Sequence, residues 1–371
     1  MRKTPLPPFR VPRMRLYAAL AAAAAALALS ACTTTRYVNP CYGAGLLIPT
    51  DATGAEIVQA ADQCIAEGGE RKQGLVIRSA GHLRDAAYDA AVADADAAIA
   101  IDPAYADAYY YRGYAHEEAG RVDAARADFD KAVELGLAPA FAMRARGRVK
   151  FLEGDFAGAY DDFDAIIAAA PEDEEAYRLR GAAAHVLERW AQAEADFSKA
   201  IELDPKDLRA YSGRAYVKYF TGRYAAAVPD FKKSLSEKPE GLKAAFLYLA
   251  MRRANDPDAA AELARQAATL DATKNPGVFP ALFLGRVSID EMVRVAIETG
   301  IHKPRENESE GFFYAGMAEL FAGNEKAAEM WFRRVLATGV VRFDEVRGAR
   351  KELRAMGIPV PSPDPRAQGG S

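Results

Sequence analysis

Residues whose types and spacing could perform catalysis are scarce in this chain of 371 residues. It has neither the Gly-x4-Gly-Lys loop that cradles nucleotide phosphates nor the His-Glu-x2-His helix that binds zinc. Its four histidines are widely separated, so they do not form a metal-ligand pattern. We therefore predict no catalytic residue, no metal and no cofactor. The histidines are His82, His116, His185 and His302.

Cysteine carries the clearest chemistry in the sequence. Cys32 ends the run Leu29-Ser30-Ala31-Cys32, which follows basic residues and an apolar, alanine-rich stretch from Leu16 to Leu29. As a helix this stretch reaches about 21 Å, short of a bilayer core of roughly 30 Å, as in a signal peptide. The four residues resemble the bacterial lipobox, where a peptidase cuts before a cysteine that receives diacylglycerol. We expect residues 1–31 to be removed and Cys32 to be lipidated; a plain signal peptide is the alternative.

A lipidated cysteine predicts where the mature protein resides. Acyl chains hold a protein at a membrane surface without a spanning helix. Thr33, rather than aspartate, follows Cys32 and resembles the rule for delivery to the outer membrane. We expect a protein anchored in the bacterial envelope, in the outer membrane facing the periplasm. A translation start at Met14 would leave the same apolar run.

The two other cysteines, Cys41 and Cys64, predict a disulfide. Export places them in an oxidising compartment. A bridge between them closes a loop of about 23 residues, which stabilises the fold by roughly 3 kcal/mol in the chain-entropy model. Two free thiols, one of them buried, are the alternative. Residues 32–71 are expected to form a tether and an N-terminal segment.

The charge balance argues against nucleic acid as a partner. The formal net charge is −4, and residues 1–31 hold five basic residues and no acidic one. Their removal leaves a net charge of −9, whereas binding to phosphate backbones needs a basic footprint.

The body of the sequence repeats with a period of 34 residues. The same helical position is taken by phenylalanine in four successive units, with alanine four residues before each one. Glycine and proline recur in the same register, and the spacing of apolar residues is helical. This pattern resembles the tetratricopeptide repeat (TPR), a pair of packed helices. The recurring residues are Phe129, Phe163, Phe197 and Phe231, then Gly113, Gly147 and Gly181, and Pro171, Pro205 and Pro239.

The resemblance implies an all-α fold, a TPR α-solenoid of stacked helical hairpins, preceded by a lipoprotein signal peptide and followed by a disordered C-terminal tail. Six units are expected over 72–275, a helical spacer over 276–308, a terminal TPR unit over 309–342, and a closing helix with the disordered tail over 343–371. The sixth unit, at 242–275, is weak, as for an end of the array that faces water. Pro229 predicts a bend or a late helix start. The carboxylates Asp161 and Asp162 are placed on a solvated face.

A stripe of basic and aromatic residues predicts a binding groove. Frame positions 2, 5, 9 and 12 of each first helix share one face, and in a TPR array these faces line the concave side. Arginine and tyrosine are frequent at binding hot spots. We expect the groove to hold an extended or helical polypeptide of acidic character. Its residues are Tyr110, Tyr114, Arg144, Arg148, Phe151, Arg178, Arg209, Tyr216, Tyr219 and Phe246, and His185 and Arg253 share the stripe.

The last 100 residues or so are more specific. The segments FPALFLGRVS, FFYAG and VRFDE resemble the C-terminal part of NlpI-like TPR lipoproteins, and the lipobox agrees with that family. The resemblance implies an adaptor that binds periplasmic proteins or peptides, among them a processing protease and cell-wall hydrolases, and a possible homodimer. The alternatives are an assembly factor of the pilotin or barrel-assembly kind and, from a different class, a cell-wall hydrolase.

Overall fold

The computed structural model describes residues 52–68, 70–300, 302–341 and 343–360. Within these ranges the chain is helical and has no strand, in agreement with the predicted all-α fold. The chain divides into two compact units, an N-terminal unit that ends at Glu153 and a C-terminal unit that begins at Gly154. No helix in the described part is both long and apolar enough to cross a bilayer.

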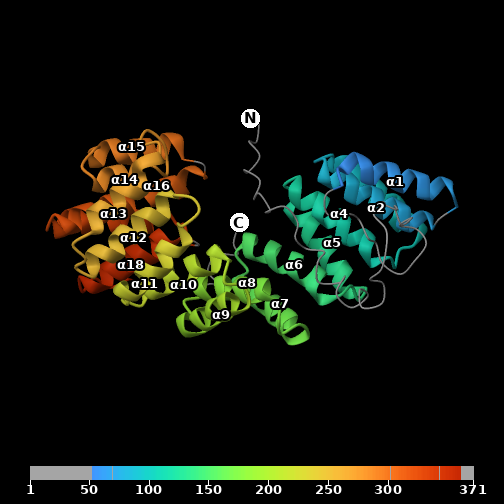
Figure 1. The fold of residues 1–371 in the computed structure, drawn as a ribbon, viewed down its shortest axis with the longest axis horizontal. Helices are drawn as coiled ribbons and strands as arrows, with labels where there is room; N and C mark the ends of the chain where they lie inside the picture. The colour runs from blue at the N-terminus through green and yellow to red at the C-terminus, as the bar shows by residue number, and fades with distance from the viewer. Residues whose placement is uncertain (1–51, 69, 301, 342, 361–371) are drawn as a thin grey trace, which may run out of the picture. The chain divides into compact units, whose positions relative to one another are not determined.

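The N-terminal unit is a series of antiparallel helices in which each helix packs on the next (Figure 1). Helix α1 stands before the first predicted hairpin and begins with a capping box between Thr53 and Glu56. The helices are α1 (Gly54–Ala66), α2 (Arg71–Arg84), α3 (Tyr88–Ile101), α4 (Ala106–Glu118), α5 (Val122–Glu134) and α6 (Pro139–Glu153).

The C-terminal unit continues the pattern and then adds the spacer and the last hairpin. The closing helix α18 returns to pack against α16, α17 and α10. The helices are α7 (Phe156–Ala169), α8 (Glu174–Val186), α9 (Trp190–Leu203), α10 (Leu208–Phe220), α11 (Tyr224–Ser234), α12 (Gly241–Arg253), α13 (Ala259–Gln266), the short 3-10 helix η2 (Ala267–Thr269), α14 (Val278–Phe283), α15 (Ile289–Thr299), α16 (Pro304–Phe321), α17 (Glu325–Ala337) and α18 (Asp344–Ala355).

The recurring glycine and phenylalanine hold each hairpin together. A Cβ atom at Gly113 of α4 would lie 2.7 Å from the ring of Phe129 on α5. The same approach recurs between Gly181 of α8 and Phe197 of α9, at 3.2 Å. A larger residue at the glycine position would push the two helices apart. The glycine and the phenylalanine therefore recur together in the sequence wherever two helices pair in this way.

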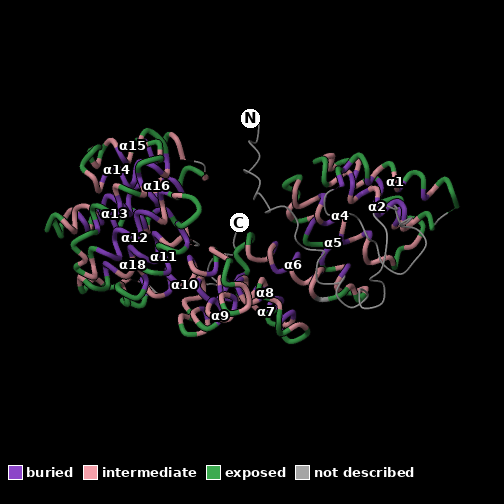
Figure 2. Tube along the Cα trace, in the orientation of Figure 1, coloured by how far each residue is buried: buried purple, intermediate pink, exposed green. Residues whose placement is uncertain are grey.

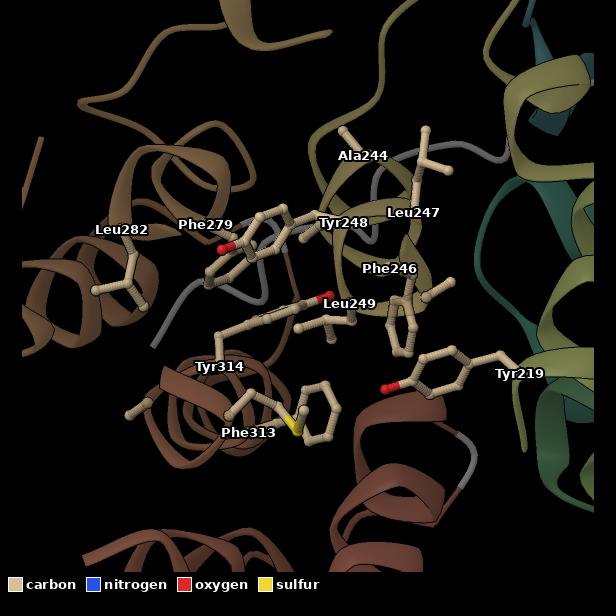
Figure 3. Packing of buried hydrophobic residues seen from close by; sticks show 14 of the residues in the cluster. Tyr219, Ala244, Phe246, Leu247, Tyr248, Leu249, Phe279, Leu282, Phe313 and Tyr314 are labelled. Atoms are coloured by element: carbon tan, nitrogen blue, oxygen red, sulfur yellow. The ribbon is translucent and has the colours of Figure 1, made fainter. Parts of the chain in front are cut away.

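Helix α12 is the centre of the C-terminal core. Its residues from Ala244 to Met251 are all buried, so it is covered on every side (Figure 2). Phe246 stacks on Phe313 of α16 at 5.7 Å, within a cluster that also takes in α10 and α14 (Figure 3). The prediction that the sixth unit is a water-facing end is therefore wrong, because the spacer and the last hairpin pack against it.

Helix α11 passes through Pro229 without the predicted late start. It begins at Tyr224 and ends at Ser234, two or three residues shorter than α5, α7 and α9. Pro229 is exposed and cannot donate a hydrogen bond to the carbonyl of Ala225. Packing of α11 against α10 and α12 holds the helix despite the missing bond.

We expect Pro229→Ala to stabilise the C-terminal unit by about 1–3 kcal/mol, because it restores a backbone donor and loses almost no packing. The measurement is urea unfolding followed by tryptophan fluorescence, since both tryptophans, Trp190 and Trp331, lie in this unit. An unchanged or lower free energy of unfolding would show that packing of the proline ring contributes as much stability as the restored hydrogen bond, or more.

Candidate protein-binding face

In the N-terminal unit the predicted stripe lies on two helices, α4 and α6. The rings of Tyr110 and Tyr114 meet edge to face at 4.9 Å, and Tyr110 also contacts Phe141 of α6 at 6.2 Å. Tyr110 is 7% exposed, so most of its area already packs between helices. Tyr114, Arg144, Arg148 and Phe151 are half-buried and keep part of their surface in solvent.

One buried acid stands among these basic and aromatic groups. The Arg148 guanidinium donates from Nη2 to Oε1 of Glu117 at 3.1 Å. Burial raises the pKa of the Glu117 carboxyl, and the charge of Arg148 partly offsets this. Burial also raises the pKa of Tyr114, so its hydroxyl is neutral at pH 7. The face of α4 and α6 thus combines basic and aromatic groups with one ion pair, between Arg148 and Glu117.

Arg178 belongs to the framework rather than to an open groove. It is 9% exposed and its Nε lies 2.9 Å from Oδ2 of Asp207. Asp207 in turn caps α10 by accepting from the backbone N–H of Arg209 at 2.9 Å. Charge reversal at Arg178 would therefore disrupt a helix start and cannot report on partner binding. The Arg209 side chain is 56% exposed and remains accessible.

Two other predicted groove residues, Tyr219 and Phe246, are covered, and their assignment to an open groove is corrected here. Phe246 is fully buried and Tyr219 is 1% exposed. Tyr216 is half-buried, with its ring 4.9 Å from that of Phe246. The residues that cover them come from α16 and α18, which the repeat pattern alone does not place.

Helix α18 lies along the predicted stripe of the C-terminal unit. Asp344 is 2.6 Å from Nε2 of His185 on α8, and Glu352 is 2.5 Å from Nη2 of Arg253 on α12. Between them, Lys351 donates to the carbonyl of Tyr219 on α10 at 2.7 Å. His185, Tyr219 and Arg253 are 34 residues apart and share frame position 12. The stripe therefore holds a helix that belongs to the chain itself.

Lys351 fixes this helix to the C-terminal end of α10. Its ammonium also donates to the carbonyl of Phe220 at 3.2 Å and lies 4.6 Å from the centre of the Tyr224 ring. Carbonyls at a helix C-terminus lack partners in their own helix and carry partial negative charge. Burial lowers the pKa of Lys351 to about 8, and the nearby Glu352 opposes this shift.

A second feature, which the sequence analysis missed, is an arginine that joins consecutive hairpins. Arg180 on α8 forms a bidentate pair with Asp196 on α9, at 2.9 and 2.6 Å. Its remaining nitrogen reaches Asp164 on α7, in the preceding hairpin. We call this arrangement an arginine rung. Equivalent rungs join Arg78 to Asp94 and Asp62, and Arg112 to Asp128 and Asp96, while Arg214 joins Asp230 to Ser198.

The rungs also correct the assignment of the carboxylates beside the repeat phenylalanines. Asp161 is exposed as predicted, but Asp162 is only 4% exposed. Its equivalents are also buried: Asp128 is 5% exposed, Asp196 is 2% exposed and Asp230 is 4% exposed. The signal was in the sequence, because arginine recurs every 34 residues and aspartate follows each one 16 positions later. These acids stabilise the scaffold and are not surface groups.

The four histidines remain separate and each lies near its own carboxylate. His82 lies near Asp94, His116 near Asp128, His185 near Asp344 and His302 near Glu310. In the described part of the chain, no cluster of His, Cys, Asp and Glu has the arrangement of a metal site.

The N-terminal cysteines are only partly described. Cys64 on α1 is buried and disulfide-bonded. Cys32 and Cys41 lie outside the described residues, so the lipidation of Cys32 and the Cys41–Cys64 pairing stay predictions.

Comparison with known proteins supports the repeat. Tetratricopeptide repeat models match residues 106–136, 174–207 and 208–240. No curated protein matches the sequence. Among solved structures, PilF of Pseudomonas aeruginosa is 16% identical, with a TM-score of 0.51 over 58% of this chain and 98% of its own. A TPR protein of Parabacteroides merdae is 18% identical, with a TM-score of 0.48 over 77% of this chain and 100% of its own.

At 16% identity the likeness to PilF shows a shared fold alone, and the resemblance to NlpI-like lipoproteins stays a prediction. The matched windows coincide with the hairpins α4–α5, α8–α9 and α10–α11, each closed by its own glycine and phenylalanine or alanine and phenylalanine. No enzymatic family is indicated. The chain therefore contains tetratricopeptide repeats, and they form an all-helical scaffold of the kind that mediates protein–protein interaction.

Proposed function

We propose that this protein is a lipid-anchored adaptor that binds periplasmic proteins through the stripe of α4 and α6 in its N-terminal unit. The anchor is the acylated Cys32. If the NlpI-like resemblance holds, the partners include a processing protease and cell-wall hydrolases, and the adaptor acts as a homodimer. Holding such proteins at one membrane raises their effective concentration for one another.

The observation that carries the proposal is the position of α18. An amphipathic helix, which presents the carboxylates of Asp344 and Glu352 and the ammonium of Lys351, lies on the stripe of α8, α10 and α12. The frame positions chosen from sequence thus suit a helix with carboxylates. In the N-terminal unit the same frame places Tyr114, Arg144, Arg148 and Phe151 with part of their surface in solvent. We infer that this second stripe takes a helix or strand from a partner.

The chemistry of the N-terminal stripe defines the partner. Aromatic rings supply rigid apolar contact at low entropic cost, and guanidinium groups favour carboxylates. An acidic partner segment would place its carboxylates beside the guanidinium groups of Arg144 and Arg148, and at Arg148 it would compete with Glu117. We therefore expect a polypeptide with aliphatic residues along one face and one or two carboxylates near these arginines.

The test is photo-crosslinking in cells with an aryl-azide phenylalanine at Tyr114 or Phe151. Tyr88 is the matched control, because it is also a half-buried aromatic residue but lies on α3. Helix α3 is the second helix of its hairpin, whereas the stripe is formed by first helices. We expect both stripe positions to capture the same partner, at least about tenfold more than Tyr88, through an acidic segment. Equal capture from all three positions, or capture through basic segments, would contradict the proposal. A secretin or an outer-membrane barrel as the shared partner would favour the assembly factor instead.

A further inference from the structure

Two buried glutamates meet at the seam where α18 packs on α16. Glu310, in the middle of α16, is 1% exposed, and Glu345, in the first turn of α18, is 5% exposed. The negative charge of Glu310, across the seam, raises the pKa of Glu345. Buried carboxylates normally face a cation or several N–H donors. This seam offers them neither in full.

The partners of the two carboxyls are mostly neutral. The Tyr314 hydroxyl, on α16, donates to Oε1 of Glu345 at 3.3 Å. The Asn275 side-chain amide, just before α14, donates to Oε2 of Glu310 at 2.9 Å. The ring of His302 lies 3.5 Å from Oε1 of Glu310. Within the described residues, no lysine or arginine forms an ion pair with either carboxyl.

The other charged groups around the seam are engaged elsewhere or are themselves acidic. Glu306 on α16 faces Glu310, and Asp344 faces Glu345. Among the described residues, His185 on α8 and Arg347 on α18 pair with Asp344. From α10, the seam is faced by the neutral Tyr216, whose pKa burial raises well above its ordinary value.

Protonation is therefore the means by which the seam avoids two adjacent negative charges. Burial raises the pKa of Glu310 to about 7 and that of Glu345 to about 8, and neighbouring carboxylates raise both further. Asp344, one residue away, shows the contrast: burial raises its pKa, but His185 and Arg347 outweigh burial and lower it. The Glu310–Glu345 pair thus holds at least one proton near neutrality, when α18 is in place.

We propose that α18 is a pH-sensitive latch, in which a proton held between Glu310 and Glu345 keeps the helix on α16 and on the repeat stripe. When the medium turns from acidic to mildly alkaline, the pair loses that proton, the two charges repel, and α18 leaves the stripe of α8, α10 and α12. The released stripe then presents His185, Tyr219 and Arg253 to solvent. This behaviour belongs to the chain itself and does not depend on any partner.

The direction of the effect follows from proton linkage. A carboxyl with a raised pKa in the docked state binds more protons there than in the undocked state. Its contribution to docking is complete below its ordinary pKa of about 4.5 and is lost as the pH rises towards the raised value. Each of the two carboxyls raises the undocking equilibrium by up to about tenfold per pH unit within that window. Lys351 titrates from about pH 8 upwards and acts in the opposite direction, so the window from pH 5.5 to 7.5 excludes its contribution, and the glutamine variants identify that of the carboxyls.

The test is amide hydrogen exchange of the full chain between pH 5.5 and 7.5, corrected for the intrinsic pH dependence of exchange. We expect exchange in 344–355 to gain at least about tenfold over this range, while α4 and α5 stay constant. Glu345→Gln and Glu310→Gln keep the shape of the pair but cannot ionise, so each should remove most of the gain. Glu308→Gln is the matched control, because it makes the same substitution on α16 at a glutamate outside the pair. It should behave as wild type.

Three outcomes would overturn the latch. One is constant protection of α18 across the range in the wild type. Another is the same gain in wild type and in both glutamine variants, which would show that neither glutamate carries the effect. The third is simultaneous loss of protection in α10 and α12, which would mean that the whole unit opens. The glutamine variants also guard against misfolding, since a folded variant must keep α18 protected at pH 5.5.

Discussion

Asp196→Ala is expected to destabilise the C-terminal unit by about 3–5 kcal/mol, because it removes the buried acceptor of the Arg180 rung. The Asp196 side chain is 2% exposed and that of Arg180 is 12% exposed. Without Asp196, the guanidinium keeps Asp164 on the preceding hairpin and the rings of Tyr160 and Tyr177, and a buried cation without its bidentate partner is strongly unfavourable. Guanidinium unfolding followed by tryptophan fluorescence measures the loss, since Trp190 and Trp331 both report on this unit.

The same rung supplies its own control. Asp164→Ala removes the second carboxylate that pairs with Arg180. The Asp164 side chain is 56% exposed, and exposed ion pairs contribute at most about 1 kcal/mol. The ratio between the two losses is therefore the informative quantity. Similar losses from both alanine variants would show that the rung acts between hairpins as strongly as within one. That result would contradict the assignment of Asp196 as the buried anchor.

The repeat could be predicted from the sequence because its contacts are short-range and recur in every unit. Gly113, Phe129 and their equivalents mark the same two helices in each unit, because one small and one large residue must meet at each hairpin. Arg112 and Asp128 carry the same period and could have been predicted with them. Short-range, repeated contacts leave a repeated trace in the sequence.

The accessible part of the stripe could not be predicted in this way. Whether Tyr219 and Phe246 face solvent depends on α18, and the contact from Lys351 to Tyr219 joins residues more than a hundred positions apart. Such a contact occurs once and leaves no period. The frame correctly identified residues that share a face, but it could not tell a stripe covered by the chain from one open to a partner.

Gly348→Val is expected to displace α18 from the C-terminal unit. A Cβ atom at Gly348 would overlap the ring of Phe313, which is fully buried on α16, and its neighbours leave no room for the ring to move. Overpacking of this kind costs about 1–3 kcal/mol, and the loss of the apolar contacts of Val346 and Leu353 adds to it. Exchange of 344–355 should become fast at pH 5.5, where the wild type is most protected. Ala355→Val is the matched control, since it adds apolar bulk to the same helix at an exposed position and should leave α18 in place.

The displaced helix then gives a direct measure of what the stripe recognises. If α18 is held by the repeat stripe, a free peptide of sequence 344–355 should bind to the Gly348→Val chain and not to the wild type, whose site is occupied. A peptide with Glu352→Lys would oppose Arg253 and should bind at least about tenfold more weakly, because it replaces a buried ion pair by two like charges. Equal binding of the two peptides, or binding of either to the wild type, would show that α18 only fills the core. Selective binding would instead show that these repeats recognise the carboxylates of a helix by the residues at frame position 12, and the stripe of α4 and α6 would be the place to look for the partner.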